Sequence, residues 1–403
     1  MIKQKSMRLS LLAAALLAVL GLAAAHAEGI KIGVLTDMAG VTSDSTGRGS
    51  VEAAHMAVED FGGSALGEPI QVVFADHQHK PDIGSAIARR WLDNDGVDVI
   101  ADVPDSAVAL AVQQIVRDRN KIVLYSSAGT TALVQQQCSL NSVQWTYDTY
   151  GLAHGTASAV VKNGGKSWFI VGADYAFGHQ LAADVTAVVQ ANGGTVLGSV
   201  WHPLNNADFS SYLLTAQASK AQIIAIASAG GDATNAIKQA AEFRLGQDGQ
   251  QLAAMIFLVQ DAHSLGLKTA QGIYLTTAFY HDVDDASRAW SRRFMDRVGA
   301  APSMLQAGVY SSVMHYLKAV KVAGSKDSTK VMEQMRSMPV EDFMTHGARI
   351  REDGHLMRDM YLAQVKSPAE SKGEWDLFKI VGRIPAEAVV WPLSESKCPL
   401  VKH

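Results

Sequence analysis

Short apolar runs alternate with segments of helical period along almost the whole chain. The run Ile30–Thr36 has the length and composition of a buried strand, and the segment Arg48–Phe61 after it places Val51, Ala54 and Val58 on one helical face. Successive parallel strands need such crossover helices between them. The alternation therefore predicts an α/β fold with doubly wound, parallel-rich sheets.

The alternation runs through two rounds. The first round ends near residue 126, and the second opens after Tyr150 and ends in an apolar run at Ala254–Val259, which we expect to be a strand. A chain of 403 residues is long enough for two domains, so we expect two α/β lobes. Three helices and a β-rich tail are expected after the second round, at Ser287–Val298, Ser303–Val322, Thr329–Ser337 and Tyr361–Phe378.

The N-terminal segment has the organisation of a secretory signal peptide. Basic residues within 3–8 precede an apolar run from Leu9 to Ala25, and the sequence Ala25-His26-Ala27 has the small-x-small form of a cleavage site. The alternative is a membrane anchor, but the run is short for a bilayer span, which needs about 20 residues. We expect cleavage after residue 27 and a mature protein in the periplasm.

Composition and charge exclude several classes of function. Hydrophobic residues make up 48% of the chain and charged residues 18%, a balance typical of a folded core. The net charge of -4 gives no basic face for nucleic acid. Two cysteines are too few for a cysteine-cluster metal site, and they leave room for one disulfide or two free thiols.

The sequence contains no motif typical of a cofactor site or a catalytic site. Residues 47–49 read Gly-Arg-Gly after the first strand, but Glu52 stands where a dinucleotide fingerprint has its third glycine. His77 and His79 lie two residues apart without a third ligand at an obvious spacing, so we expect solvated loop histidines instead of a metal site. We therefore expect no enzyme activity, no cofactor and no metal.

Polar loops follow several of the predicted strands. They include Thr42-Ser43, Ser106 and the segment Ser126–Thr131. Ligands of open α/β sheets bind outside the carboxyl ends of the strands. A Ser/Thr/Gly turn that leads into a helix offers hydroxyls and free backbone N–H groups to a carboxylate. The alternative for Ser106 and Thr130 is that each is simply a helix N-cap.

Short motifs in a fixed order resemble a known family. They read IGVLTDMAG at 32–40, AVEDFGG at 57–63, DYAFG at 174–178, DFSS at 208–211, AGGD at 229–232, QAGVYS at 306–311 and CPLVK at 398–402. The ordered series resembles the periplasmic substrate-binding proteins of ABC importers, leucine/isoleucine/valine-binding type. The resemblance implies two Rossmann-like lobes joined by three crossings, with a ligand cleft between lobes that close by hinge motion.

The resemblance also implies how the chain is divided. Residues 28–147 and 281–356 would form the first lobe, and residues 148–280 and 357–403 the second lobe with the C-terminal tail, after a signal peptide at 1–27. It implies a small-molecule carboxylate ligand, the membrane permease subunits of an ABC importer as partners, no nucleic acid, and a monomer. A ligand-sensing protein that reports to another partner is an alternative, and an enzyme on the same fold is a further one.

The family's contacts to the ligand carboxylate fall on two turns of this sequence. Ser106 matches the serine that contacts the carboxylate after the third strand. Ala128 and Thr130 match the turn whose backbone N–H and hydroxyl bind it, with Thr131 as an alternative in register. The resemblance therefore implies an anion anchor in the first lobe.

Other contacts carried over from the family surround the rest of the ligand. Tyr147 and Asp148 lie in the first crossing, and Tyr175 belongs to a turn in which Phe177 stands where tyrosine is more usual. The first loop, where the family often has an aromatic residue, carries small side chains. These side chains are Thr42 and Ser43.

The sequence leaves the ligand open between an aromatic carboxylate and a branched-chain amino acid. A buried α-ammonium needs a carboxylate partner, for which Asp148, Asp232 and Asp261 are the candidates. Tyr147, Tyr150 and Tyr175 could instead hold an aromatic ring, and the small first loop leaves it room. We therefore expect a bulky or aromatic carboxylate, with an amino acid as the alternative.

The two cysteines are expected to pair. Cys138 and Cys398 flank segments that the resemblance places near the hinge, and no other cysteine competes. Unpaired thiols in an oxidising periplasm are open to oxidation, so a disulfide is the simpler state. The alternative is two buried free thiols.

Overall fold

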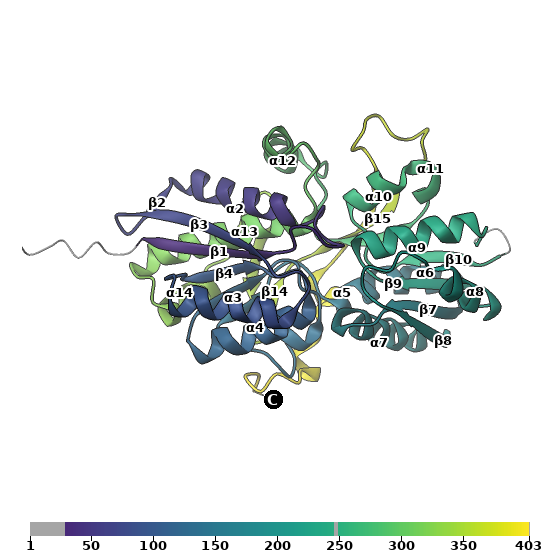
Figure 1. Ribbon diagram of the computed structural model, residues 1–403, viewed down its shortest axis with the longest axis horizontal. Helices are drawn as coiled ribbons and strands as arrows, with labels where there is room; N and C mark the ends of the chain where they lie inside the picture. Colours follow the sequence, from purple (N-terminus) through teal and green to yellow (C-terminus); the bar gives the residue numbers. More distant parts are fainter. Residues whose placement is uncertain (1–28, 246–248, 403) are drawn as a thin grey trace, which may run out of the picture.

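Two α/β lobes lie side by side in the computed structural model, which describes residues 29–245 and 249–402 (Figure 1). The expected signal peptide at 1–27 lies outside the described residues. In the described ranges, no helix is both long and apolar enough to cross a bilayer. The two lobes confirm the fold class that the strand–helix alternation predicts.

The first lobe is built on a six-stranded sheet with the order β2-β3-β1-β4-β5-β6. Its neighbours pair in parallel except β2, which pairs antiparallel with β3. The strands are β1 Ile30–Thr36, β2 Ser64–Ala65, β3 Glu68–Asp76, β4 Val99–Asp102, β5 Ile122–Tyr125 and β6 Ser142–Gln144. The covering helices are α2 Gly47–Phe61, α3 Pro81–Asp93, α4 Ser106–Asp118, α12 Asp285–Val298, α13 Met304–Ala323 and α14 Ser328–Ser337.

The second lobe repeats this construction on a four-stranded parallel sheet with the order β10-β9-β7-β8. The strands are β7 Ser167–Ala173, β8 Thr195–His202, β9 Ile223–Ala227 and β10 Gln251–Ala254. Its helices are α5 Thr149–Leu152, the π-helix η2 Ala153–Ala157, α6 Ser158–Lys162, α7 Ala176–Ala191, α8 Ser210–Ala218, α9 Gly230–Glu242, α10 Val259–Leu265 and α11 Leu267–Ala270.

Both sheets are buried on their two faces, which explains why their strands read as continuous apolar runs. Val34 packs under α2 and α13, whereas its neighbour Leu35 packs under α3 and α4 on the opposite face. In the second lobe, Ile170 packs against α7 on one face of the sheet, and Val171 packs against α8 and α9 on the other. Each such fully buried side chain contributes about 1.5–3 kcal/mol.

The chain crosses between the lobes three times, after β6, after β11 and after β14 (Figure 1). Side chains tie the crossings together: His355 Nε2 lies 3.2 Å from Asp148 Oδ2, and Arg358 donates to the carbonyl of Ala278 at 3.0 Å. The remaining elements are η1 Thr131–Leu133, β11 Tyr274–Thr277, β12 Val340–Glu341, β13 His346–Ile350, β14 Leu356–Met357, β15 Met360–Val365, β16 Phe378–Ile384, α15 Ala386–Val389 and η3 Leu393–Glu395.

The strand expected at Ala254–Val259 is wrong. The pairing of β10 with β9 ends at Ala254, and α10 begins at Val259. The apolar residues between them are buried, but they run out of the sheet toward the cleft. Burial alone produced the strand-like pattern, because a short apolar run does not reveal whether it has a pairing partner.

The expected disulfide between Cys138 and Cys398 is confirmed, with Cα atoms 5.6 Å apart. The sulfurs pack with Val401 in a small apolar cluster of their own. The bond ties the end of the chain to the loop between η1 and β6.

Replacing both cysteines by serine is expected to lower the free energy of unfolding by about 2–4 kcal/mol, because the bond closes a loop of 260 residues and restrains the unfolded chain. Denaturant unfolding of both proteins without reductant measures the difference. Wild type with reductant is the control. Equal midpoints in all three samples would contradict the expectation.

Candidate functional site

A small cavity lies between the lobes, at the carboxyl ends of both main sheets. It measures about 20 Å3, room for about one water molecule. Wider surface grooves of about 410–430 Å3 lie elsewhere, but this cavity occupies the place where open α/β sheets bind ligands. Its lining residues are Thr42, Ser45, Pro104, Ser127, Tyr147, Tyr175, Phe177, Ala229, Gly230, Ile256, Leu258 and Leu305.

The order of the strands brings these residues together. The loops after β1, β4 and β5 supply Thr42, Pro104 and Ser127. The segments after β7, β9 and β10 supply the facing wall, and α9 begins there with Gly230. The N-terminus of a helix carries partial positive charge, so this wall suits an anion.

Aromatic rings make up much of the apolar wall. Tyr147 donates from its hydroxyl to the carbonyl of Ser127 at 2.8 Å, which fixes its ring against the turn after β5. A Cβ atom at Gly129 in that turn would lie 2.7 Å from the rings of both Tyr147 and Phe177. The turn therefore packs directly on the rings, and only glycine fits at this position.

Of the site residues expected from the resemblance, Thr42, Tyr147 and Tyr175 line the cavity. Ser43 faces a neighbouring groove of about 420 Å3 between α2 and α10. Four other expected site residues of the first lobe are buried behind the cavity wall. They are Ser106, Ala128, Thr130 and Thr131.

Ser106 and Thr130 support the turn after β5. Ser106 Oγ accepts a hydrogen bond from Thr130 N at 3.2 Å, and Thr130 caps η1 by accepting from Ala132 N. Neither residue is among those that line the cavity. Their contacts fit the N-cap alternative for Thr130, while Asp105 is the residue that caps α4.

The three acidic candidates for binding an ammonium group all accept hydrogen bonds from backbone N–H groups instead. Asp148 caps α5 through Gly151 N at 2.7 Å. Asp232 accepts from the backbone of the loop before α8, and Asp261 accepts from Leu258 N at 2.7 Å. Among the residues that line the cavity in the described chain, there is no aspartate or glutamate.

Sequence reasoning missed several lining residues. Ser127 and Pro104 lie within the polar turns that the sequence singled out, one or two residues from the expected contacts. Ile256 and Leu258 were assigned to a strand, and Leu305 lies in the first turn of α13, far along the chain. Their apolar side chains give no local signal that separates a cavity wall from core.

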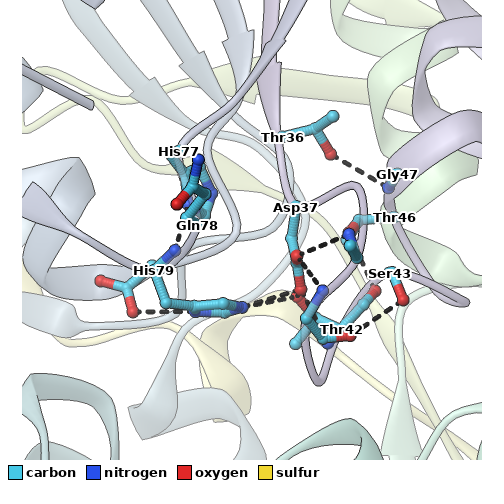
Figure 2. Close-up of polar contacts among 12 residues, drawn as sticks. Thr36, Asp37, Thr42, Ser43, Thr46, Gly47, His77, Gln78 and His79 are labelled. Atoms are coloured by element: carbon cyan, nitrogen blue, oxygen red, sulfur yellow. Dashed lines mark hydrogen bonds and ion pairs between the residues drawn. The ribbon is translucent and has the colours of Figure 1, made fainter. Parts of the chain in front are cut away.

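A buried ion network underlies the loop that carries Thr42. His79 Nε2 lies 2.8 Å from Asp37 Oδ2, and its Nδ1 lies 3.1 Å from Asp105 Oδ2 (Figure 2). The His79 side chain is 6% exposed, so the expectation of solvated histidines is wrong. His77 is also fully buried and accepts from His79 N at 3.0 Å. Buried carboxylates, instead of solvent, surround the ring nitrogens of His79.

The two histidines of this segment differ in protonation state. Burial lowers the pKa of His79, but hydrogen bonds and charge from Asp105 and Asp37 outweigh it and raise the pKa to about 9. Burial lowers the pKa of His77 to about 4, with a further lowering by the charge of His79. At neutral pH, His79 is an imidazolium and His77 is neutral.

A second buried carboxyl lies at the end of β4. Asp102 accepts from Thr36 Oγ1 at 2.7 Å and also from the hydroxyls of Ser126 and Ser127. Asp102 has φ +81° and Val103 has φ +55°, conformations that L-residues rarely adopt. Such strain clusters at functional sites, and here it directs the chain toward the cavity.

The family of this chain follows from comparison with known proteins. The model of the family described as periplasmic binding protein matches residues 29–374. The chain is similar to a periplasmic binding protein of Burkholderia mallei, with 49% identity and a TM-score of 0.92 over 93% of this chain and 100% of the other. The chain therefore belongs to the periplasmic binding protein family.

Two further relatives carry more specific names. A branched chain amino acid ABC transporter periplasmic ligand-binding protein of Burkholderia xenovorans LB400 is 40% identical, with a TM-score of 0.83 over 93% of this chain and 100% of the other. A Leu/Ile/Val-binding protein homolog 6 of Brucella melitensis is 26% identical over 362 residues, 87% of this chain and 91% of the other.

The charge of His79 is expected to stabilise the fold only at lower pH. Its pKa is raised in the folded state, so the stabilisation is complete below about pH 6.5 and is lost as the pH rises to about 9. The difference amounts to roughly 3 kcal/mol. Denaturant unfolding of wild type and His79→Gln from pH 6 to 9.5 measures it.

His179→Gln is the matched control, because His179 forms an exposed pair with Asp174 at 2.8 Å. The difference between wild type and His79→Gln should shrink toward pH 9.5, while His179→Gln should follow wild type throughout. A constant difference between wild type and His79→Gln across this range would contradict a charged His79.

Proposed function

We propose that the protein captures a small carboxylate in the cleft between its lobes and delivers it to an ABC importer. The observation that carries this proposal is the cavity at the facing carboxyl ends of the two sheets, lined by aromatic rings and hydroxyls. The family and the ABC transporter component that it resembles support delivery to a membrane permease.

The electrostatics of the cleft support an anionic ligand. α9 points its N-terminus at the cavity through Gly230. The hydroxyls of Thr42, Ser45 and Ser127 line the same cavity, but they donate to Asp37, to the carbonyl of Thr42 and to Asp102, so the attraction for an anion comes from the helix N-terminus. A carboxylate suits this arrangement better than a cation does.

The ligand that the cavity favours is an aromatic or otherwise bulky carboxylate. Tyr147, Tyr175 and Phe177 surround an aromatic ring well, and the lining residues include no carboxylate for an α-ammonium. The names of the relatives favour the second candidate, a branched-chain amino acid. With an amino acid, the partner of the ammonium would be Asp261, which lines an adjoining pocket of about 160 Å3 between the lobes, or Asp232 once it leaves its two backbone N–H partners.

Capture of such a ligand requires the lobes to part. A cavity of about 20 Å3 holds no molecule of this size, so the ligand enters an opened cleft that then closes. Residues 28–147 and 281–356 would move as the first lobe, and residues 148–280 and 357–403 as the second, except that the disulfide holds the end of the tail on the first lobe. The disulfide joins the end of the tail to Cys138, beside the hinge.

The remaining features of the proposal follow from this role. The protein would act without enzymatic turnover and without a cofactor. A cleaved signal peptide at 1–27 would place it in the periplasm, where it would work as a monomer that binds no nucleic acid. A sensor that reports ligand to another partner is the competing role, which a neighbouring permease gene would argue against.

Binding of an aromatic carboxylate is expected to raise the melting temperature of the protein more than leucine or valine does. A panel of benzoate- and cinnamate-type acids, branched-chain amino acids and the methyl esters of the acids measures this. The esters should stabilise little, because they lack the charge that α9 attracts. Stabilisation by leucine or valine alone would assign the site to amino acids instead.

Tyr175→Ala is expected to weaken binding of the best acid about tenfold in calorimetry, because the ring loses its contact with the ligand. Tyr150→Ala is the control, since Tyr150 stacks on His154 away from the cavity. Equal weakening by both changes would show that the loss comes from the fold and not from the cavity wall.

A further inference from the structure

The loop between β1 and α2 touches the second lobe through its backbone. The N–H of Gly231, in the first turn of α9, donates to the carbonyl of Val41 at 2.8 Å. Gly230 has φ +56°, and a Cβ atom there would overlap the carbonyl of Val41. A Cβ atom at Gly231 would lie 3.8 Å from Val41, at ordinary contact distance. The close approach of the lobes therefore depends on the position of Val41.

The shape of this loop depends on Asp37, which is fully buried. Asp37 accepts from Gly40 N at 2.6 Å, from Thr42 N at 2.9 Å and from Thr42 Oγ1 at 2.7 Å. Val41 lies between two residues held by the same carboxylate. Figure 2 shows the His79 ring reaching Asp37 and Thr42 from the opposite side.

His79 reaches that position at a conformational cost. Gln78 has φ +53° and His79 has φ +54°, so two successive non-glycine residues adopt the left-handed backbone region. Non-glycine residues keep such conformations only where the surroundings impose them. The ion pairs with Asp37 and Asp105 are the interactions that hold the ring in place.

The charge of His79 also acts across the cleft. Asp232 lies in the first turn of α9 and is 2% exposed. Burial raises the pKa of Asp232. Four interactions oppose this rise, in decreasing order the N–H of Asn206, the charge of His202, the N–H of Asn205 and the charge of His79. The charge of His79 is the smallest of these four contributions.

We propose that His79 is a positioning residue for lobe closure: its imidazolium pairs with Asp37 and so holds the 37–46 loop in the shape that presents Val41 to α9. The proposal rests on the proposed function, because closure is the step that traps the ligand. His79 reaches the cavity wall only through Thr42, so it shapes affinity without lining the cavity itself.

The titratable groups that face His79 set the pH range over which it holds the 37–46 loop. They are Asp37 after β1, Asp105 before α4, the neutral His77 on its own segment, and Asp232 across the cleft. Loss of the His79 proton removes the charge that pairs with Asp37 under the loop. Affinity should therefore be constant near pH 7 and fall as the pH rises through about 9.

A double-mutant cycle between the lobes tests the proposal. Calorimetry gives the affinity of wild type, His79→Gln, Gly230→Ala and the double variant for the best acid of the ligand panel, at pH 7 and pH 9.5. We expect each single change to weaken binding about tenfold at pH 7, and the double variant to weaken it by much less than the product of the two. The wild-type loss at pH 9.5 should be absent in His79→Gln.

A second pair of variants tests the contact without altering His79. Gly230→Ala should weaken binding at least tenfold, because its Cβ atom would overlap the Val41 carbonyl, whereas Gly231→Ala should bind like wild type. Small-angle scattering without any ligand should show a larger radius of gyration for His79→Gln and Gly230→Ala than for wild type and Gly231→Ala.

The two measurements separate failure of this inference from failure of the proposed function. If wild type binds no acid or amino acid of the panel, the proposed function fails, and the scattering data still decide whether His79 holds the lobes together. If the effects of His79→Gln and Gly230→Ala simply multiply, and the radius of gyration is unchanged in His79→Gln, the positioning role of His79 is refuted.

Discussion

All parallel strands of the two main sheets end at the cleft, and the rest of the site depends on this constraint. A parallel sheet carries its polar, irregular turns at the carboxyl ends of its strands, because the crossover helices return on its faces. The chain sets two such edges opposite each other, so six turns from distant parts of the sequence meet at one cavity. Few of these residues would face one another in either lobe alone.

The cleft joins apolar contacts that line the cavity with ionic contacts that lie behind its wall. The rings of Tyr147 and Phe177 belong to the same buried cluster as Leu305, so the cavity wall is continuous with the core. The network of Asp37, His79 and Asp105 lies behind the wall and sets the shape of the first loop. Such a network is costly to leave half-satisfied, which explains why both ring nitrogens of His79 face carboxylates.

The sequence was sufficient for the parts of the fold that repeat. Alternating apolar runs and amphipathic segments predict the two parallel sheets, and the position of Cys138 and Cys398 in an exported chain predicts their bond. The run at 254–259 was assigned wrongly because a strand is defined by its partner, which a local pattern does not contain. The short strands β12 and β14 were missed for the same reason.

The lining of the cavity was predictable to the turn but not to the residue. The polar turns after β1, β4 and β5 do reach the cavity, where Ser127 and Pro104 line it and Ser106 and Thr130 do not. Which side chain of a turn faces the cavity depends on backbone angles such as those of Asp102 and Val103, which residue type does not reveal. His77 and His79 were misjudged because their carboxylate partners lie on other loops.

The most direct test of ligand capture is mass spectrometry of the small molecules that the purified protein releases on denaturation. The account predicts one carboxylate per chain, with an aromatic or other bulky apolar group, which binds again to the refolded protein and is absent from the released fraction of a control protein. Release of no carboxylate, or of a cationic or uncharged molecule that rebinds with one-to-one stoichiometry, would contradict it.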